Sequence, residues 1–340
     1  MQSVTNSSPT HTLEQSPRHA RPLGGDTARH TRSSALIDLS NQVLNNSDGS
    51  QSLMMLRKPS WIRAKLPTGA GYQAIRANME EHNLNTVCQE ASCPNIGDCW
   101  SRGTATIMIL GDICTRACGF CNVKTGKPAA PDYDEPVNVG KSIALMGLRH
   151  IVITCVDRDD LPDGGAQLWA ETIQAVHAHA PSTSVEALIG DFQGNKTDLQ
   201  RVIDAKPEIL AHNLETVPRM HGAVRPQATY DRSMQVLTRI KESGLVSKTG
   251  IMVGIGETDD EIIALLADIR EKAKTEIITI GQYLQPSRNH LPIDRWVHPD
   301  QFELYKEIGL QLGFRVVESG PMVRSSFHAE EQVREFESKK

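Results

Sequence analysis

Three closely spaced cysteines constrain this chain more than any other feature of its sequence. Cys114, Cys118 and Cys121 stand at the spacing C-x3-C-x2-C, directly after an apolar run at residues 106–110. Cysteine thiolates are soft ligands that suit iron–sulfur clusters. Three thiolates on a four-iron cluster leave one iron open for a small ligand, and Phe120 is placed to shield the cluster or stack on that ligand. A zinc site and unrelated buried cysteines are the alternatives for this loop.

A second group of three cysteines precedes the first. Cys88, Cys93 and Cys99 follow the spacing C-x4-C-x5-C, and Pro94 and Gly97 predict that the group forms a loop around a metal centre. The group predicts either a second iron–sulfur cluster, with one ligand from elsewhere in the chain, or a structural zinc loop. Six of the seven cysteines lie in these two groups, and such clustering in a 340-residue chain indicates metal ligands in a reducing compartment.

Short β-branched segments alternate with longer amphipathic segments after residue 103. The pattern predicts strands at 104–110, 150–156, 184–189, 209–213, 248–254 and 276–283, and helices at 135–148, 165–179, 196–205, 229–243, 258–274 and 299–312. Such strand–helix pairs predict an α/β fold with a parallel sheet and right-handed crossovers, and they favour a partial (β/α)6 barrel over a doubly wound open sheet. Ligands bind at the carboxyl ends of strands in both architectures. Polar residues follow the predicted strands at Cys114, Asp157, Asp191, Asn213 and Glu257.

The two ends of the chain differ from its middle. Residues 1–55 are rich in Ser, Thr and Asn and predict a disordered tail that lacks the apolar core of a secretory signal. Residues 56–103 form an N-terminal extension that carries the second cysteine group, 104–314 the barrel, and 315–340 a C-terminal segment. Alternating charges at 330–340 predict an exposed helix end. The net charge of −5 gives no general basic surface for nucleic acid, and no apolar run reaches the length of a membrane span.

The paired cysteine groups, taken with later motifs, resemble the lipoyl synthase family of the radical S-adenosylmethionine (SAM) superfamily. The likeness extends over most of the chain after residue 56 and includes the segments 152–166, 212–219, 249–258, 281–286 and 319–329. The resemblance implies a partial (β/α)6 TIM-type barrel of the radical SAM kind. It also implies N- and C-terminal extensions that carry an auxiliary iron–sulfur cluster.

The same resemblance implies an activity and its cofactors. Two sulfur atoms would be inserted at C6 and C8 of an octanoyl chain that is amide-linked to a lysine of a lipoyl carrier protein. Because these C–H bonds are unactivated, a 5′-deoxyadenosyl radical would abstract the hydrogens. The implied cofactors are SAM and two 4Fe-4S clusters, of which the auxiliary one is consumed as the sulfur source. The implied ligands are Cys114, Cys118 and Cys121 for the SAM-binding cluster, and Cys88, Cys93, Cys99 and Ser326 for the auxiliary cluster.

The motif that contains Ser326 departs from the family pattern at one position. Phe327 stands where the family usually has Tyr, which puts in doubt any role for a phenol there but not the serine ligation. Taken without the cysteines, Ser325-Ser326 would instead predict a helix N-cap before His328.

Three further sites are candidates for holding SAM. Asp163-Gly164-Gly165 follows the second predicted strand, where a glycine backbone allows close approach of the methionyl amine; a simple turn into the next helix is the alternative. Asn213 and Glu215 follow the fourth strand and are suited to hydrogen bonds with the ribose or the amine. Arg225 is suited to a charge-assisted pair with the SAM carboxylate, and a surface salt bridge is its alternative.

Partners and compartment follow from the resemblance as expectations. The substrates would be octanoylated lipoyl domains of 2-oxoacid dehydrogenase E2 subunits and the glycine cleavage H protein. An electron donor such as ferredoxin or flavodoxin and an iron–sulfur carrier protein would assist, and no nucleic acid or membrane partner is expected. The expected compartment is the cytoplasm, or an organelle matrix if the N-terminal tail is a transit peptide. The alternative functions are another radical SAM activity and a non-catalytic zinc or electron-transfer protein.

Overall fold

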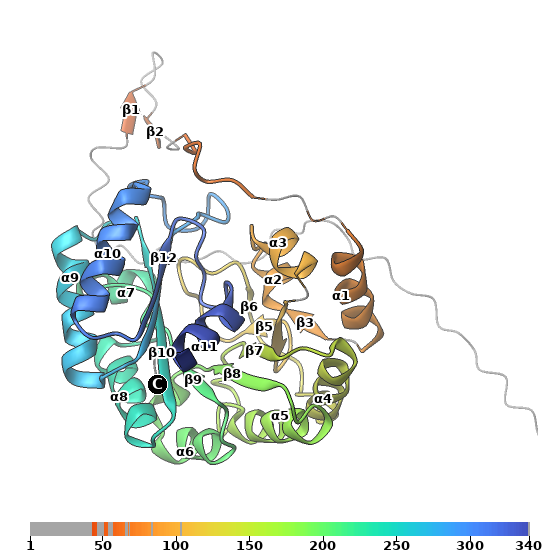
Figure 1. The fold of residues 1–340 in the computed structure, drawn as a ribbon. Coiled ribbons are helices and arrows are strands. Elements are labelled where there is room, and N and C mark those ends of the chain that lie inside the picture. Colours follow the sequence, from red (N-terminus) through yellow and green to blue (C-terminus); the bar gives the residue numbers. More distant parts are fainter. Residues whose placement is uncertain are drawn as a thin grey trace, which may run out of the picture.

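A single large sheet organises the chain (Figure 1). The computed structural model describes residues 43–45, 51–53, 57–64, 67, 69–82, 84–102 and 104–338. Each strand pairs in parallel with its neighbours, except that the last one, at an edge, is antiparallel. The order across the sheet is β12 (Val316–Gly320), β11 (Ile277–Gln282), β10 (Val246–Val253), β9 (Ile209–Ala211), β8 (Ser184–Leu188), β7 (His150–Cys155), β4 (Thr106–Ile109) and β3 (Asn85–Thr86).

Helices connect the parallel strands and lie around the outside of the sheet (Figure 1). The predicted alternation of strands and helices is therefore confirmed, and so is the α/β fold with a mostly parallel sheet. Among the described strands the sheet is not closed, because β12 and β3 form its two edges. The connecting helices are α4 (Glu135–Met146), α5 (Ala166–His179), α6 (Lys196–Asp204), α8 (Tyr230–Glu242), α9 (Asp259–Asp268) with a π-helical turn (Ile269–Ala273), and α10 (Pro299–Gln311).

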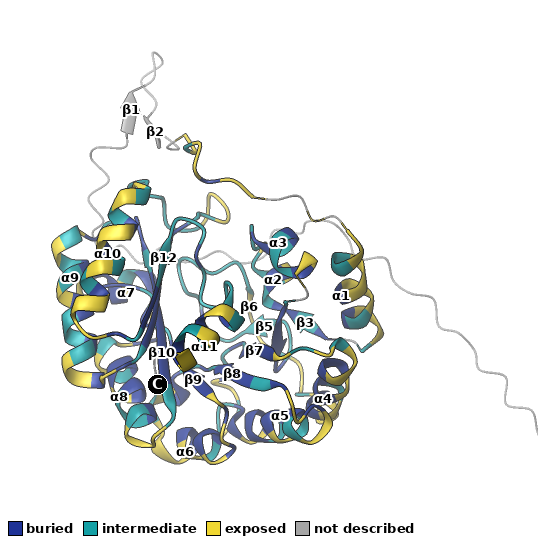
Figure 2. Cartoon of the chain, viewed as in Figure 1, coloured by how far each residue is buried: buried dark blue, intermediate teal, exposed yellow. Residues whose placement is uncertain are grey.

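The central strands of the large sheet are buried on both faces, whereas the helices are exposed on their outward side (Figure 2). All residues of β4, β9 and β11 are buried, as expected for parallel strands that are covered on one side by helices and filled on the other by side chains. Trp169 of α5 is fully buried between the helices and the sheet. Among the described residues, no helix combines the length and the apolar character that a membrane crossing requires.

The second cysteine group is helical, so the prediction of a loop there was wrong. Cys88 lies on α2 (Val87–Glu90) and Cys99 on α3 (Ile96–Ser101), with Cys93 in the turn between them. The side chain of Thr86 accepts a hydrogen bond from the backbone N–H of Gln89, and this cap starts α2. Pro94 and Gly97 therefore do not prevent helices on either side of the turn. The helix α1 (Ala70–Glu81) precedes this group and contacts α3.

The C-terminal segment is more integrated than its sequence indicates. The strand β12 was not predicted, and it adds a parallel strand beside β11. The predicted exposed helix end is instead α11 (Ala329–Ser338), in which Gln332 and Phe336 are buried. Phe336 belongs to a small apolar cluster with the first residues of three strands, so α11 covers that end of the sheet on its inner side (Figure 1). These first residues are Ile209 of β9, Ile277 of β11 and Val316 of β12.

The predicted disordered tail, residues 1–55, lies outside the described residues apart from two short strands. These strands, β1 (Val43–Asn45) and β2 (Gln51–Leu53), pair with each other in antiparallel register.

Candidate active site

The first cysteine loop is fastened to the carboxyl ends of neighbouring strands. Cys114 ends β5 (Ile113–Cys114), which pairs with β6 (Lys124–Thr125) and so closes the loop between them. The backbone N–H of Thr115 donates to the carbonyl of Asp157, directly after β7, at 3.0 Å. The N–H of Gly119 donates to the carbonyl of Val224, the last residue of α7 (His221–Val224), at 2.9 Å. The backbone therefore fixes the loop at both of its sides.

The three thiols of this loop lie together and are largely buried. Burial is the largest influence on each of them and raises the pKa, to about 11 for Cys121. The charge of Cys114 adds a smaller upward effect to the pKa values of Cys118 and Cys121. The three sulfurs therefore lie near one another. Buried thiols become thiolates when a cation takes the place of solvent, and iron supplies that positive charge. The donor set therefore fits an iron–sulfur cluster.

The thiols of the second group also lie together. Burial raises the pKa of Cys88 to about 11 and that of Cys99 to about 12, and Cys93 adds a smaller upward effect to both. Within the described part of the chain, no three His, Cys, Asp or Glu side chains converge closely enough to hold a single metal ion.

Ser326 lies beside the second cysteine group although it is far away in sequence. Its Oγ accepts a hydrogen bond from the Oγ1 of Thr106 at 2.8 Å, and Thr106 lies beside Cys88, where it partly offsets the rise that burial causes in the pKa of that thiol. The side-chain amide of Asn95 holds the segment in place by donating to the carbonyl of Met322 at 2.7 Å. The structure thus brings Ser326 close to Cys88, one of the cysteines with which the family resemblance groups it.

Asn213, Glu215 and Arg225 lie between the two cysteine groups. The Nδ2 of Asn213 donates to Glu215 Oε1 at 2.9 Å and to the Oγ of Ser325 at 2.8 Å. The Nη1 of Arg225 donates to the backbone carbonyl of Asn213 at 2.8 Å. The charge of Glu215 raises the pKa of Cys121, and that of Arg225 lowers the pKa of the buried Cys118, so both face the first loop. Ser325 connects the same residues to the C-terminal segment.

The backbone of Glu215 is held in an unusual conformation. Its φ of 66° lies in the left-handed region, which a non-glycine residue adopts at a cost of order 1–3 kcal/mol. Two backbone hydrogen bonds fix it: its N–H donates to the carbonyl of Gly250, and its carbonyl accepts from Met252. Such strain, held in place by a neighbouring strand, is typical of functional positions. Burial raises the pKa of the Glu215 carboxyl, and the charge of Arg225 partly offsets that rise.

The turn Asp163-Gly164-Gly165 shows the contacts of a helix start. The carboxylate of Asp163 accepts hydrogen bonds from the N–H groups of Gly165 (3.0 Å) and Gln167 (2.9 Å) and so caps α5. Gly165 has a φ of +86°, and a Cβ there would lie 2.5 Å from a methyl group of Leu110. These contacts agree with the turn alternative and leave the SAM role of the segment a prediction. Phe120 is partly buried against the apolar core that contains Val224.

Sequence reasoning missed several residues that organise the site. Asp157 and Asp191 were recognised at strand ends, but their shared partner Arg116, inside the first cysteine loop, was not. Thr106 and Ser325 were missed because only the folded chain brings them to the cysteine groups. An arginine between two cysteines of the first group, followed by acidic residues after two strands, was the available signal for Arg116.

The chain matches two family models and is similar to known proteins over most of its length. Residues 108–269 match the Radical SAM superfamily, and residues 4–93 match the N-terminal domain of lipoyl synthase of the radical SAM family. The chain is 53% identical over 277 residues to "Lipoyl synthase, mitochondrial" of Nematostella vectensis, covering 81% of this chain and 95% of that protein. It is 52% identical over 277 residues to "Lipoyl synthase" of Christiangramia forsetii, covering 81% and 94%.

A solved structure with a similar arrangement is Streptococcus suis SuiB bound to S-adenosylmethionine. The TM-score is 0.49 at 12% sequence identity, covering 73% of this chain and 53% of that chain. Identities of about half over four fifths of the chain, together with the two matching family regions, determine the assignment. The chain belongs to the lipoyl synthase family of the radical SAM superfamily.

Proposed function

We propose that this chain makes lipoyl groups with two separate four-iron clusters that the fold holds side by side. As a member of the lipoyl synthase family it is a sulfur-inserting radical SAM enzyme that uses SAM and 4Fe-4S chemistry on a lipoyl-domain substrate. Cys114, Cys118 and Cys121 would hold the SAM-binding cluster. The auxiliary cluster would be held by Cys88, Cys93, Cys99 and Ser326. The observation that supports this division is the hydrogen bond between Ser326 and Thr106, which lies beside Cys88.

The chemistry explains why two sites must be adjacent. When bound, the first cluster supplies one electron for cleavage of SAM to the hydrogen-abstracting radical, and the second supplies sulfur. The chain contributes orientation and the exclusion of water. Asn213 contacts Glu215, which faces the first cysteine loop, and Ser325, which precedes Ser326 of the second group. A substrate chain bound beside Asn213 would therefore face both clusters.

The residues between the groups are suited to holding SAM beside the open iron. Glu215 and Asn213 offer a carboxylate and an amide for the methionyl amine and the ribose. Arg225 offers a buried cation near Cys118 for the methionyl carboxylate. Phe120 would shield this side of the cluster from water. The turn Asp163-Gly164-Gly165 stays a prediction as a SAM contact.

Stoichiometry sets further requirements. Two C–H bonds are replaced, so two SAM molecules are spent for each lipoyl group, and the auxiliary cluster is consumed.

The substrates would be octanoylated lipoyl domains of 2-oxoacid dehydrogenase E2 subunits and the glycine cleavage H protein. Ferredoxin or flavodoxin would supply electrons, and an iron–sulfur carrier protein would rebuild the auxiliary cluster. The cytoplasm is the proposed compartment, with the organelle matrix as the alternative that the mitochondrial name of one relative supports.

Ser326→Ala is expected to separate sulfur insertion from SAM cleavage. Sulfur insertion into an octanoyl-lysine peptide should fall about tenfold or more, as loss of a ligand costs at least as much as loss of a ligand's hydrogen-bond partner. SAM cleavage should stay within about twofold, because Ser326 contacts the other cysteine group. Both products are measured by mass spectrometry after anaerobic reconstitution.

Two companion variants sharpen this experiment. Serine oxygen is a harder and weaker partner for iron than a thiolate, so Ser326→Cys should keep the auxiliary cluster but release its iron to a chelator more slowly than the unmodified protein. Ser338→Ala, at the exposed end of α11, is the matched control and should change neither product. If Ser326→Ala inserted sulfur as well as the unmodified protein does, Ser326 would not be a ligand.

A further inference from the structure

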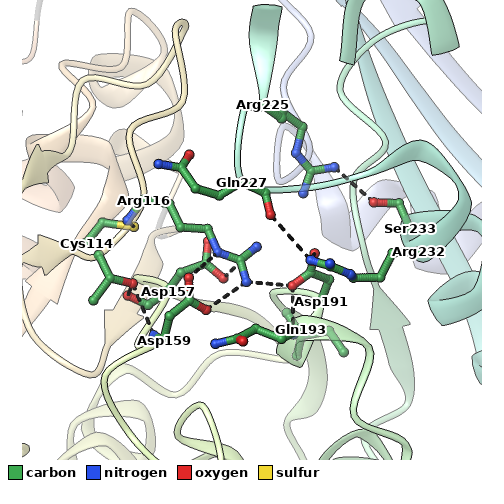
Figure 3. A network of polar contacts seen from close by, with 12 residues as sticks. Cys114, Arg116, Asp157, Asp159, Asp191, Gln193, Arg225, Gln227, Arg232 and Ser233 are labelled. Atoms are coloured by element: carbon green, nitrogen blue, oxygen red, sulfur yellow. Dashed lines mark hydrogen bonds and ion pairs between the residues drawn. The ribbon is translucent and has the colours of Figure 1, made fainter. Parts of the chain in front are cut away.

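A buried arginine lies inside the first cysteine loop. Arg116 stands between Cys114 and Cys118 in the sequence, and its side chain is only 2% exposed. An arginine in a short loop at the end of a sheet normally extends into solvent, since burying its charge without partners is costly. Figure 3 shows its guanidinium pointing away from the sulfur of Cys114 into a group of acidic side chains.

Three carboxylates surround this guanidinium. Its Nε and Nη2 donate to both oxygens of Asp159 at 2.7 and 2.8 Å, and its Nη2 donates to Asp191 at 2.7 Å. Its Nη1 lies 3.6 Å from Asp157. Asp191 is shared with Arg232 of α8, whose Nη1 lies 3.2 Å from it (Figure 3). Arg116 therefore joins the cysteine loop to the segments that follow β7 and β8 and, through Asp191, to α8.

The network lies against the cysteines, and burial raises the pKa of Asp157, while the charges of Arg116 and, more weakly, Arg225 lower it. It contains three aspartates and two arginines. Burial by itself would raise the pKa of Asp191, but the hydrogen bond and the charge of Arg116 outweigh it and lower the pKa to about 2, so Asp191 is ionised at neutral pH. Asp157 lies beside the cysteine loop, since its backbone carbonyl accepts a hydrogen bond from the N–H of Thr115, the residue after Cys114, at 3.0 Å.

We propose that Arg116 is a positioning residue that tunes the reduction potential of the cluster on its own loop. It does so by neutralising the carboxylates of Asp157, Asp159 and Asp191, which surround its guanidinium. The proposal rests on the proposed function, in that Cys114, Cys118 and Cys121 hold an iron–sulfur cluster. Reduction adds one negative charge to the cluster, and nearby net charge and burial set how readily it does so. Without Arg116, the carboxylates of Asp157 and Asp191 would oppose the incoming electron in a medium that screens charge weakly.

The test is a redox titration of the reconstituted full-length protein, followed by electron paramagnetic resonance. SAM binds at the open iron, so the signal that changes on adding SAM reports the first cluster and not the auxiliary one. Arg116→Gln should lower the ratio of reduced to oxidised cluster about tenfold at a fixed potential, a shift of about 59 mV to the negative side for one electron. Adding Asp191→Asn to Arg116→Gln should move the potential back toward that of the unmodified protein.

Control variants separate charge from folding. Arg76→Gln removes an exposed arginine that pairs with Glu80 on α1 and should leave the potential unchanged. Asp159→Asn keeps Arg116 and removes a half-exposed negative charge, so it should shift the potential to the positive side. If Arg116→Gln does not take up iron, the single variants Arg116→Lys and Asp159→Asn test the proposal instead. Arg116→Lys keeps the positive charge and should keep the potential of the unmodified protein, while Asp159→Asn should shift it to the positive side.

The outcomes distinguish this inference from the function on which it rests. An unchanged potential in both Arg116→Gln and Asp159→Asn, with a normal SAM-responsive signal, would overturn the role of Arg116 alone. A double variant whose potential is no closer to that of the unmodified protein would also overturn it, since a purely structural role predicts further loss. Absence of a SAM-responsive signal in the unmodified protein would overturn the proposed function, and this inference with it.

Discussion

Cys121→Ala is expected to abolish SAM cleavage. The loop around Cys121 would supply three thiolates to its cluster, and a vacant position left by alanine would give the cluster two open irons and a weaker hold on the protein. The formation of 5′-deoxyadenosine in the presence of dithionite should fall by a factor of about 100 or more. Sulfur insertion should stop with it, because the hydrogen-abstracting radical is no longer formed. Anaerobic reconstitution followed by chromatography of the nucleoside products measures the first effect.

Cys155→Ala is the matched control for this experiment. Cys155 ends β7 and belongs to neither cysteine group, although it is close enough to Cys114 for the charge of that residue to raise its pKa, after burial and Asp157. Its substitution removes a buried sulfur without removing a ligand. It should keep both SAM cleavage and sulfur insertion. A loss of SAM cleavage in Cys155→Ala equal to that in Cys121→Ala would contradict the assignment of the first loop.

Cys93→Ala is expected to give the opposite pattern. SAM cleavage should stay within about twofold of that of the unmodified protein, while sulfur insertion disappears. Cys93 lies in the turn of the second group, and the residues that influence its thiol are Asn95 and Arg324. The iron content should fall by about half, because one of two four-iron clusters is lost.

The comparison of the two variants tests the division of labour between the clusters. Equal loss of SAM cleavage in Cys121→Ala and Cys93→Ala would show that the two groups do not act separately. Continued sulfur insertion by Cys93→Ala would show that the second group does not supply the sulfur.

The sequence predicted the central part of the fold closely because parallel strands are continuous apolar runs. The predicted strand at 150–156 is β7 at His150–Cys155, and the predicted helix at 196–205 is α6 at Lys196–Asp204. β12 was missed because only two of its five residues are apolar, and its stability comes from pairing with β11. Alternating charges around Phe336 concealed the buried side of α11 for a similar reason, since the partners of Phe336 come from three distant strands.

The candidate site was predictable where ligands are close in sequence and not where they are brought together by folding. Cysteine spacing identified both groups, and the resemblance supplied Ser326. The bridge between Thr106 and Ser326 spans 220 residues, and no local pattern indicates it. Arg116 shows the same limit, because its partners Asp159 and Asp191 come from segments after two different strands.

The measurement that tests the central claim most directly is an anaerobic assay with SAM, dithionite and an octanoyl-lysine peptide, read by mass spectrometry. The account predicts a mass gain from two inserted sulfur atoms, with 5′-deoxyadenosine formed alongside and with no added sulfur source beyond the protein's own clusters. Formation of 5′-deoxyadenosine with an unchanged peptide would contradict the role given to the second cluster.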